Sequence, residues 1–172
     1  MMILVTGGSG SGKSAFAEDQ VVSFGEAERV YIATMFPFDE ESKKRVQRHR
    51  NMRSGKGFET IECYTDLAQV RVSKGSTVLL ECMSNLTANE LYLDTGAKDR
   101  TREAVLEGIR ELEKRCRGLV AVTNEVFCDL PPADEEMQEY LSVLGTINCR
   151  MAKMADQVTE VVYGIPVEVK KG

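Results

Sequence analysis

The sequence predicts an α/β fold, with a mostly parallel sheet flanked by helices and antiparallel strands at the C-terminal edge. Two observations carry this prediction. Short, continuously apolar runs of the kind found in buried parallel strands alternate with segments of helical length. Near the C-terminus, two β-like runs meet at a single glycine, Gly164, as in an antiparallel pair. The 172 residues contain no long linker or repeat, so residues 1–172 are expected to form one domain.

These patterns predict seven strands and six helices in order along the chain. The expected strands span residues 3–6, 30–34, 58–63, 77–82, 119–123, 157–163 and 165–170. The expected helices span residues 13–24, 40–52, 65–72, 85–93, 99–117 and 133–154. An apolar stripe between charges marks the helix at 99–117. The last helix is expected to begin after Pro131 and Pro132, with acidic residues in its first turn.

A phosphate-binding loop is predicted where the first strand meets the first helix. The run Gly7-Gly8-Ser9-Gly10-Ser11-Gly12-Lys13-Ser14 fits the pattern Gly-x-x-x-x-Gly-Lys-Ser/Thr. Glycines let successive backbone N–H groups point at phosphate oxygens, and the helix that begins at Lys13 adds its positive N-terminus. We expect Lys13 to reach the β- and γ-phosphates and the Ser14 hydroxyl to ligate Mg²⁺. A companion carboxylate is expected at the end of a neighbouring strand, where Glu81 stands, to hold the metal or its water.

Charge is spread very unevenly along the chain. The formal net charge is −5, from 22 basic and 27 acidic residues. Residues 43–56 contain no acidic residue and seven basic ones, namely Lys43, Lys44, Arg45, Arg48, Arg50, Arg53 and Lys56. The acidic remainder argues against general nucleic-acid binding, whereas the positive segment indicates a small polyanionic ligand.

The only histidine, His49, lies in the middle of this basic segment. Arg45, His49 and Arg53 are four residues apart and therefore share one face of the predicted helix. The neighbouring cations disfavour the protonated imidazolium and neutralise an approaching phosphate, so a neutral His49 could attack phosphorus. A solvated basic helix with an incidental histidine is the alternative, and the residues alone leave both open.

Several motifs in this order and spacing resemble a known family. Besides the phosphate loop they are Tyr31-Ile32-Ala33-Thr34, Arg45-Val46-Gln47-Arg48-His49-Arg50, Leu79-Leu80-Glu81-Cys82 and Thr123-Asn124-Glu125-Val126. Together they are similar, over the whole chain, to the bifunctional adenosylcobinamide kinase/adenosylcobinamide-phosphate guanylyltransferase family of cobalamin biosynthesis. The resemblance implies a P-loop NTPase with a RecA-like sheet, Mg²⁺ as cofactor, and ATP and GTP as substrates.

The resemblance also implies roles for individual residues. His49 matches the histidine that becomes guanylylated, and Lys13 is the other catalytic residue. Nucleotide contacts are implied for Gly7, Gly8, Ser9, Gly10, Ser11, Gly12, Lys13, Ser14, Thr34, Met35, Phe36, Arg50, Asn51, Met52, Arg53, Glu62 and Glu81. Ser14 and Glu81 are the implied metal site. The implied partners are adenosylcobinamide and its phosphate, in a homotrimer, with no nucleic acid and no stable membrane insertion.

The chain departs from the family pattern at three places. Gly10 stands where the family has an arginine, and residues 127–132 and 141–149 differ from its usual motifs. A relative that keeps only one of the two activities therefore stays open, as does a P-loop nucleotide hydrolase that acts as a switch. A nucleotide-dependent nucleic-acid-binding module is a third alternative, against which the acidic remainder speaks. No signal peptide or long apolar run is recognisable, so a cytoplasmic protein is expected.

Overall fold

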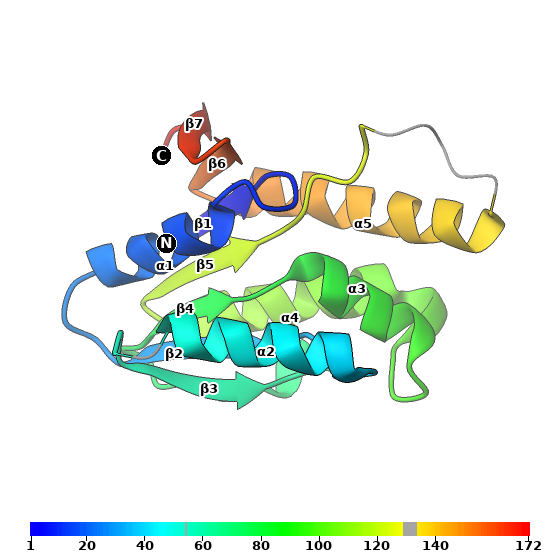
Figure 1. Ribbon diagram of the computed structural model, residues 1–172, viewed down its shortest axis with the longest axis horizontal. Coiled ribbons are helices and arrows are strands. Elements are labelled where there is room, and N and C mark those ends of the chain that lie inside the picture. Colours follow the sequence, from blue (N-terminus) through cyan, green and yellow to red (C-terminus); the bar gives the residue numbers. More distant parts are fainter. Residues whose placement is uncertain (54, 129–133) are drawn as a thin grey trace.

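A single seven-stranded sheet forms the centre of the molecule (Figure 1). The structure is a computed structural model that describes residues 1–53, 55–128 and 134–172, apart from the side chains of residues 45, 49, 52 and 53. In spatial order the strands are β3 (Phe58–Glu62), β2 (Arg29–Ala33), β4 (Thr77–Leu80), β5 (Gly118–Val122), β1 (Met2–Thr6), β6 (Gln157–Val162) and β7 (Ile165–Lys170). Every predicted strand is present, with ends shifted by one or two residues.

All neighbouring strands are parallel except the last pair, β6 and β7. In Figure 1 the arrowheads of β3, β4 and β5 accordingly point the same way. A two-residue turn joins β6 to β7, with Tyr163 at φ 50° and Gly164 at φ 79°. Two successive residues at positive φ are typical of the tight hairpin turn that matches strand twist. The predicted antiparallel C-terminal edge is confirmed.

Helices cover both faces of the sheet. On one face α1 (Lys13–Ser23) packs Ala17 and Val21 into an apolar cluster with alternate residues of the central strands. On the other face α3 (Met83–Tyr92), α4 (Thr101–Arg115) and α5 (Glu135–Met154) share the larger cluster. The connection from β1 to β2 through α1 and the connection from β2 to β3 through α2 (Glu40–Arg53) both run toward the β3 edge of the sheet. Right-handed connections that run in the same direction place their helices on the same face, so α2 lies on the face of α1. Figure 1 shows α2 in front of the sheet and α4 behind it.

The last helix begins at Glu135, where the Asp134 carboxylate accepts a hydrogen bond from the backbone N–H of Glu136 at 3.1 Å. This side chain satisfies one of the free N–H groups of the first turn. The predicted start after Pro131 and Pro132 falls outside the described residues. Among those that are described, no helix combines the length and the apolar character needed to cross a membrane.

The helix predicted for residues 65–72 is wrong, since only a single 3-10 turn, Leu67–Gln69, forms there. Asp66, just before it, has φ 53°, a left-handed conformation that cannot continue an α-helix. Its backbone N–H donates to the buried carboxylate of Glu90 at 2.7 Å. The Asp66 N–H is therefore bonded to a side chain from a distant helix, and not to a carbonyl of the preceding turn as it would be inside an α-helix.

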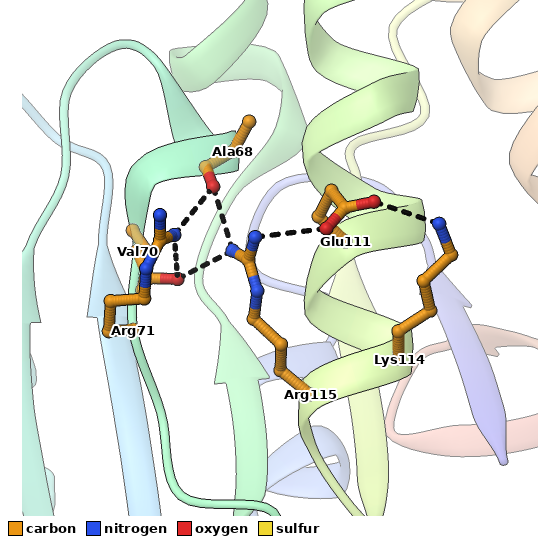
Figure 2. Close-up of polar contacts among 6 residues, drawn as sticks. All are labelled: Ala68, Val70, Arg71, Glu111, Lys114 and Arg115. Carbon is orange, nitrogen blue, oxygen red and sulfur yellow. Dashed lines mark hydrogen bonds and ion pairs between the residues drawn. The ribbon is translucent and has the colours of Figure 1, made fainter.

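Arg115 on α4 also keeps this segment out of an α-helix (Figure 2). Its guanidinium donates to the carbonyls of Ala68 at 2.7 Å and Val70 at 2.9 Å, while Glu111 accepts from its second nitrogen at 2.9 Å. In an α-helix those carbonyls would accept from N–H groups four residues later. The turn lies so close to α4 that a Cβ on Gly108 would come within 2.7 Å of the Leu67 Cβ.

Replacing Gly108 by alanine is expected to destabilise the fold. The added methyl must push the Leu67–Gln69 turn away from α4, and overpacking of this kind costs about 1–3 kcal/mol. Urea unfolding should show a lower midpoint for Gly108→Ala. At Gly75 an added Cβ meets no atom within 4 Å, so Gly75→Ala is the matched control. An equal midpoint for Gly108→Ala and the wild type would contradict the close packing described here.

Candidate functional site

The phosphate loop lies between the end of β1 and the start of α1 and is clamped on both sides. The backbone N–H of Glu125, beyond β5, donates to the Gly7 carbonyl at 3.0 Å. From the other side the N–H of Gly164, in the β6–β7 turn, donates to the Ser11 carbonyl at 2.8 Å. Gly7 has φ 151°, and a Cβ there would lie 2.5 Å from the Val161 carbonyl oxygen. The loop is therefore built around a close backbone approach that only glycine allows.

Lys13 folds back over this loop. Its Nζ donates to the Gly8 carbonyl at 2.9 Å, which places the ammonium group above the loop's own backbone. Burial lowers the pKa of Lys13, and the nearby Cys82 thiol acts in the opposite direction. A partly desolvated ammonium group interacts more strongly with phosphate oxygens than an exposed one does. This geometry suits the predicted phosphate contact of Lys13.

Ser14 and Glu81 line the same small pocket, together with Glu18, Tyr31, Leu79 and Val122. Ser14 comes from the first turn of α1, and Glu81 directly follows β4. A hydroxyl and a carboxylate are hard oxygen donors of the kind that Mg²⁺ prefers. The two residues predicted as the metal site are thus brought to one place, and their chemistry fits that ion.

Thr34 holds the Glu81 carboxylate in this pocket. Its backbone N–H donates to Glu81 Oε2 at 3.1 Å, and its hydroxyl donates to the Cys82 carbonyl at 2.9 Å. The Thr34 carbonyl accepts from Asn89 Nδ2 at 2.8 Å. Thr34 is fully buried, so in this structure its contribution is to fix the end of β4 against the end of β2.

A second cluster lies beyond the ends of β2 and β3. Arg50 of α2 forms an ion pair with Glu62 at 2.7 Å, and the Tyr64 hydroxyl donates to the same carboxylate at 3.0 Å. The Phe36 ring stands edge-on to Tyr64, with centroids 5.0 Å apart, and contacts Phe38. Burial, followed by the Glu62 carboxylate, raises the pKa of Tyr64. The Arg50–Glu62 pair is half-exposed on both sides, so it is worth about 1 kcal/mol or less and can open for a ligand.

Helix α2 carries the predicted nucleophile. It begins at Glu40, where the Asp39 carboxylate accepts from the Ser42 N–H at 2.7 Å, and its backbone includes His49. The side chains of His49, Met52 and Arg53 lie outside the described part of the structure, so their predicted roles stay predictions. Asn51 is described, and its side chain accepts from Gln47 Nε2 at 2.9 Å within the helix. Met35 lies partly buried after β2.

Two residues near the phosphate loop were not singled out as site residues from the sequence. Glu18 lies four residues after Ser14, one helical turn on, and is buried in the pocket that Glu81 also lines. Lys56 comes from the far end of the basic segment, and its Nζ lies 2.6 Å from Glu18 Oε2. The four-residue spacing between Ser14 and Glu18 was the one sequence signal that could have identified Glu18 as a site residue. An acidic residue on a helix is usually solvated, so this spacing alone did not single it out.

Sequence comparison finds one family over nearly the whole chain. A model described as cobinamide kinase / cobinamide phosphate guanyltransferase matches residues 3–169. The chain is 34% identical to the bifunctional adenosylcobalamin biosynthesis protein CobU of Salmonella typhimurium, over 99% of this chain and 100% of that protein. It is 33% identical to CobU of Escherichia coli, with the same coverage. With CobP of Pseudomonas aeruginosa, which has the same descriptive name, it shares 32% over 99% of this chain and 98% of the relative.

Solved structures resemble the chain in fold. An ATPase from the type III secretion system of pathogenic bacteria superposes with a TM-score of 0.54 at 9% identity, over 97% of this chain and 56% of that one. The flagellar accessory protein FlaH from Methanocaldococcus jannaschii gives 0.50 at 13% identity, over 99% and 78%. At such identities the likeness concerns the fold alone. It agrees with the predicted fold class, a mostly parallel sheet flanked by helices with antiparallel strands at the C-terminal edge.

Replacing Glu81 by glutamine is expected to weaken the effect of Mg²⁺ on nucleotide binding. Glutamine keeps an acceptor for the Thr34 N–H but removes the charge that faces Ser14 across the pocket. In calorimetric titrations, the gain in GTP affinity that Mg²⁺ produces should shrink about tenfold, or ~1.4 kcal/mol. Glu59→Gln, an exposed acid on β3, is the control. An undiminished Mg²⁺ effect in Glu81→Gln would remove Glu81 from the metal site.

Proposed function

Because the chain belongs to the cobinamide kinase / cobinamide phosphate guanyltransferase family, we propose that His49 carries GMP between the two substrates of the second reaction. The chain is a bifunctional enzyme of cobalamin biosynthesis, with cobinamide kinase and guanylyltransferase activities. The finer proposal is that the substrates are adenosylcobinamide and then its phosphate, with ATP or GTP as phosphate donor and GTP as guanylyl donor.

In the kinase reaction, a hydroxyl oxygen of the acceptor attacks the γ-phosphorus of the nucleotide. The bond from that phosphorus to the β-phosphate oxygen breaks, a nucleoside diphosphate leaves, and the hydroxyl proton is released. The phosphate loop and Lys13 bind the phosphates and stabilise the charge that develops on them. Ser14 and Glu81 would hold Mg²⁺, which neutralises phosphate charge when it is bound.

In the guanylyl transfer, a neutral His49 nitrogen attacks the α-phosphorus of GTP. A P–N bond forms, the bond to the β-phosphate oxygen breaks, and pyrophosphate leaves. An oxygen of the phosphorylated acceptor then attacks the same phosphorus, and the P–N bond breaks to release His49. The arginines of the basic helix lower the charge repulsion between the two anionic reactants.

The observation that carries this proposal is the composition and placement of α2. The helix holds the only histidine of the chain among six basic residues, and it lies on the same face of the sheet as α1, the helix that begins at the phosphate loop. Glu62, the last residue of β3, forms an ion pair with Arg50 of that helix. The Tyr64 hydroxyl donates to the same carboxylate, and the Phe36 ring stands edge-on to Tyr64. We assign these residues, with the phosphate loop, to nucleotide binding.

Assembly and location belong to the proposal as well. The edge strand β7 exposes Ile165, Val167 and Val169, which a neighbouring subunit of a homotrimer could cover. The acidic charge outside residues 43–56 supports small-molecule substrates in place of nucleic acid. A cytoplasmic location suits an enzyme that uses ATP and GTP.

The proposed nucleophile is tested with GTP labelled at the α-phosphate. The wild type should acquire acid-labile label in the absence of acceptor, because a phosphoramidate hydrolyses in acid. His49→Ala should acquire none, while its kinase rate with cobinamide stays within about twofold. A nucleotide hydrolase that acts as a switch predicts phosphate release without cobinamide and no label in either protein. Equal labelling of His49→Ala and the wild type would exclude His49 as the nucleophile.

Lys13→Ala is expected to slow both reactions. Removal of one preorganised donor to a phosphoryl group typically costs about 100-fold or more in rate. Steady-state kinase assays and single-turnover labelling should therefore fall together, in contrast to the selective effect of His49→Ala. A kinase rate equal to that of the wild type would show that Lys13 does not act on the transferred phosphate.

A further inference from the structure

The basic helix α2 has no apolar face with which to pack on the sheet. Val46 and Met52 are the only apolar residues among its fourteen. In the described part of the structure, no other helix or strand makes an extensive contact with α2. A helix that is polar all round depends on specific polar contacts for its position. The Arg50–Glu62 pair is one such contact, but it is half-exposed and weak.

A stronger contact lies three residues beyond the end of α2, at Lys56. Its Nζ lies 2.6 Å from Oε2 of Glu18, whose side chain is only 3% exposed, and 4.0 Å from Oδ1 of Asp19. The backbone carbonyl of Lys56 accepts a hydrogen bond from Arg29 Nη1 at 2.8 Å. Both the side chain and the main chain of Lys56 are therefore held, one by α1 and the other by β2.

Glu18 connects this contact to the reaction site. It lies one helical turn after Ser14 and lines the same pocket as Ser14 and Glu81. A buried carboxylate without a partner is strongly unfavourable, so Glu18 holds Lys56 firmly as long as both are charged. The ion pair thus ties the basic segment to the helix that begins at the phosphate loop.

The length of chain between His49 and Lys56 makes this tie restrictive. Four residues of helix rise about 6 Å, and three extended residues span at most about 10 Å. As long as α2 stays helical, the His49 backbone therefore lies within about 16 Å of the Lys56 backbone. An imidazole must come within about 3–3.5 Å of the α-phosphorus to react, so restricting its search increases the population of productive arrangements.

We propose that Lys56 and Glu18 are positioning residues for guanylylation, because the ion pair between Lys56 and the buried Glu18 carboxylate fixes the end of the His49-bearing segment to the phosphate-loop helix. The inference rests on the proposed role of His49. Neither residue touches the reacting atoms. The kinase reaction does not use His49, so loss of the tie should slow guanylylation far more than it slows the kinase reaction.

The decisive variant is the double replacement Glu18→Gln/Lys56→Met. It removes the tie without leaving a buried charge unpaired, and such replacements are commonly tolerated by the fold. Single-turnover incorporation from α-labelled GTP should be at least tenfold slower than in the wild type, a loss at least tenfold larger than any loss in kinase kcat, with an unchanged melting temperature. The single variant Lys56→Arg keeps the positive charge opposite Glu18, so its labelling rate should be close to that of the wild type.

Lys114→Met is the matched control, because Lys114 forms an exposed pair with Glu111 at 2.8 Å on α4. It should label at the wild-type rate. Labelling at the wild-type rate by the double variant would overturn the inference, and so would an equal loss of kinase and guanylylation. Absence of label in the wild type would instead refute the proposed role of His49, so the two failures are distinguishable.

Discussion

The phosphate loop keeps its shape because two neighbouring strands bind its backbone. Glu125, after β5, donates to Gly7, and Gly164, between β6 and β7, donates to Ser11. Both bonds require β1 to lie inside the sheet, with β5 on one side and β6 on the other. These two bonds use carbonyl groups of the loop, so they leave its N–H groups for the phosphate contacts that we propose. The C-terminal hairpin, distant in sequence, in this way supports the backbone of the proposed phosphate site.

The remaining elements are attached to the sheet in two different ways. The helices α1, α3, α4 and α5 bury apolar residues in the two clusters that flank the strands. Among the described side chains of helix α2 only Val46 is apolar, and Arg50 and the following Lys56 form ion pairs that hold this segment. Concentrating cations around His49 suits phosphate chemistry, but it removes the apolar stripe that would otherwise dock the helix. The basic composition that would favour the proposed reaction of His49 therefore leaves the helix dependent on polar contacts for its position.

Local patterns in the sequence were sufficient to predict those elements whose conformation is decided by neighbouring residues. The glycines and Lys13 of the phosphate loop, the alternation of strand and helix, and the C-terminal hairpin could all be predicted from neighbouring residues. The segment at residues 65–72 could not, because Glu90 and Arg115 take its backbone groups from a distance in the chain. Its residues are compatible with a helix, and only their tertiary partners decide against one.

The sequence by itself determined the fold class, the phosphate loop and the likeness to a bifunctional kinase and guanylyltransferase. It also placed Glu81 at the end of a strand, and the family resemblance implied that Glu81 shares a metal site with Ser14. Only the tertiary structure placed Glu18 in the pocket of Ser14 and Glu81 and paired it with Lys56. The reason is that the two partners of an ion pair leave no regular spacing in the sequence, unlike the apolar residues of a helix or a strand. A charged side chain has many possible partners in the sequence, and the folded sheet selects one by bringing it within reach.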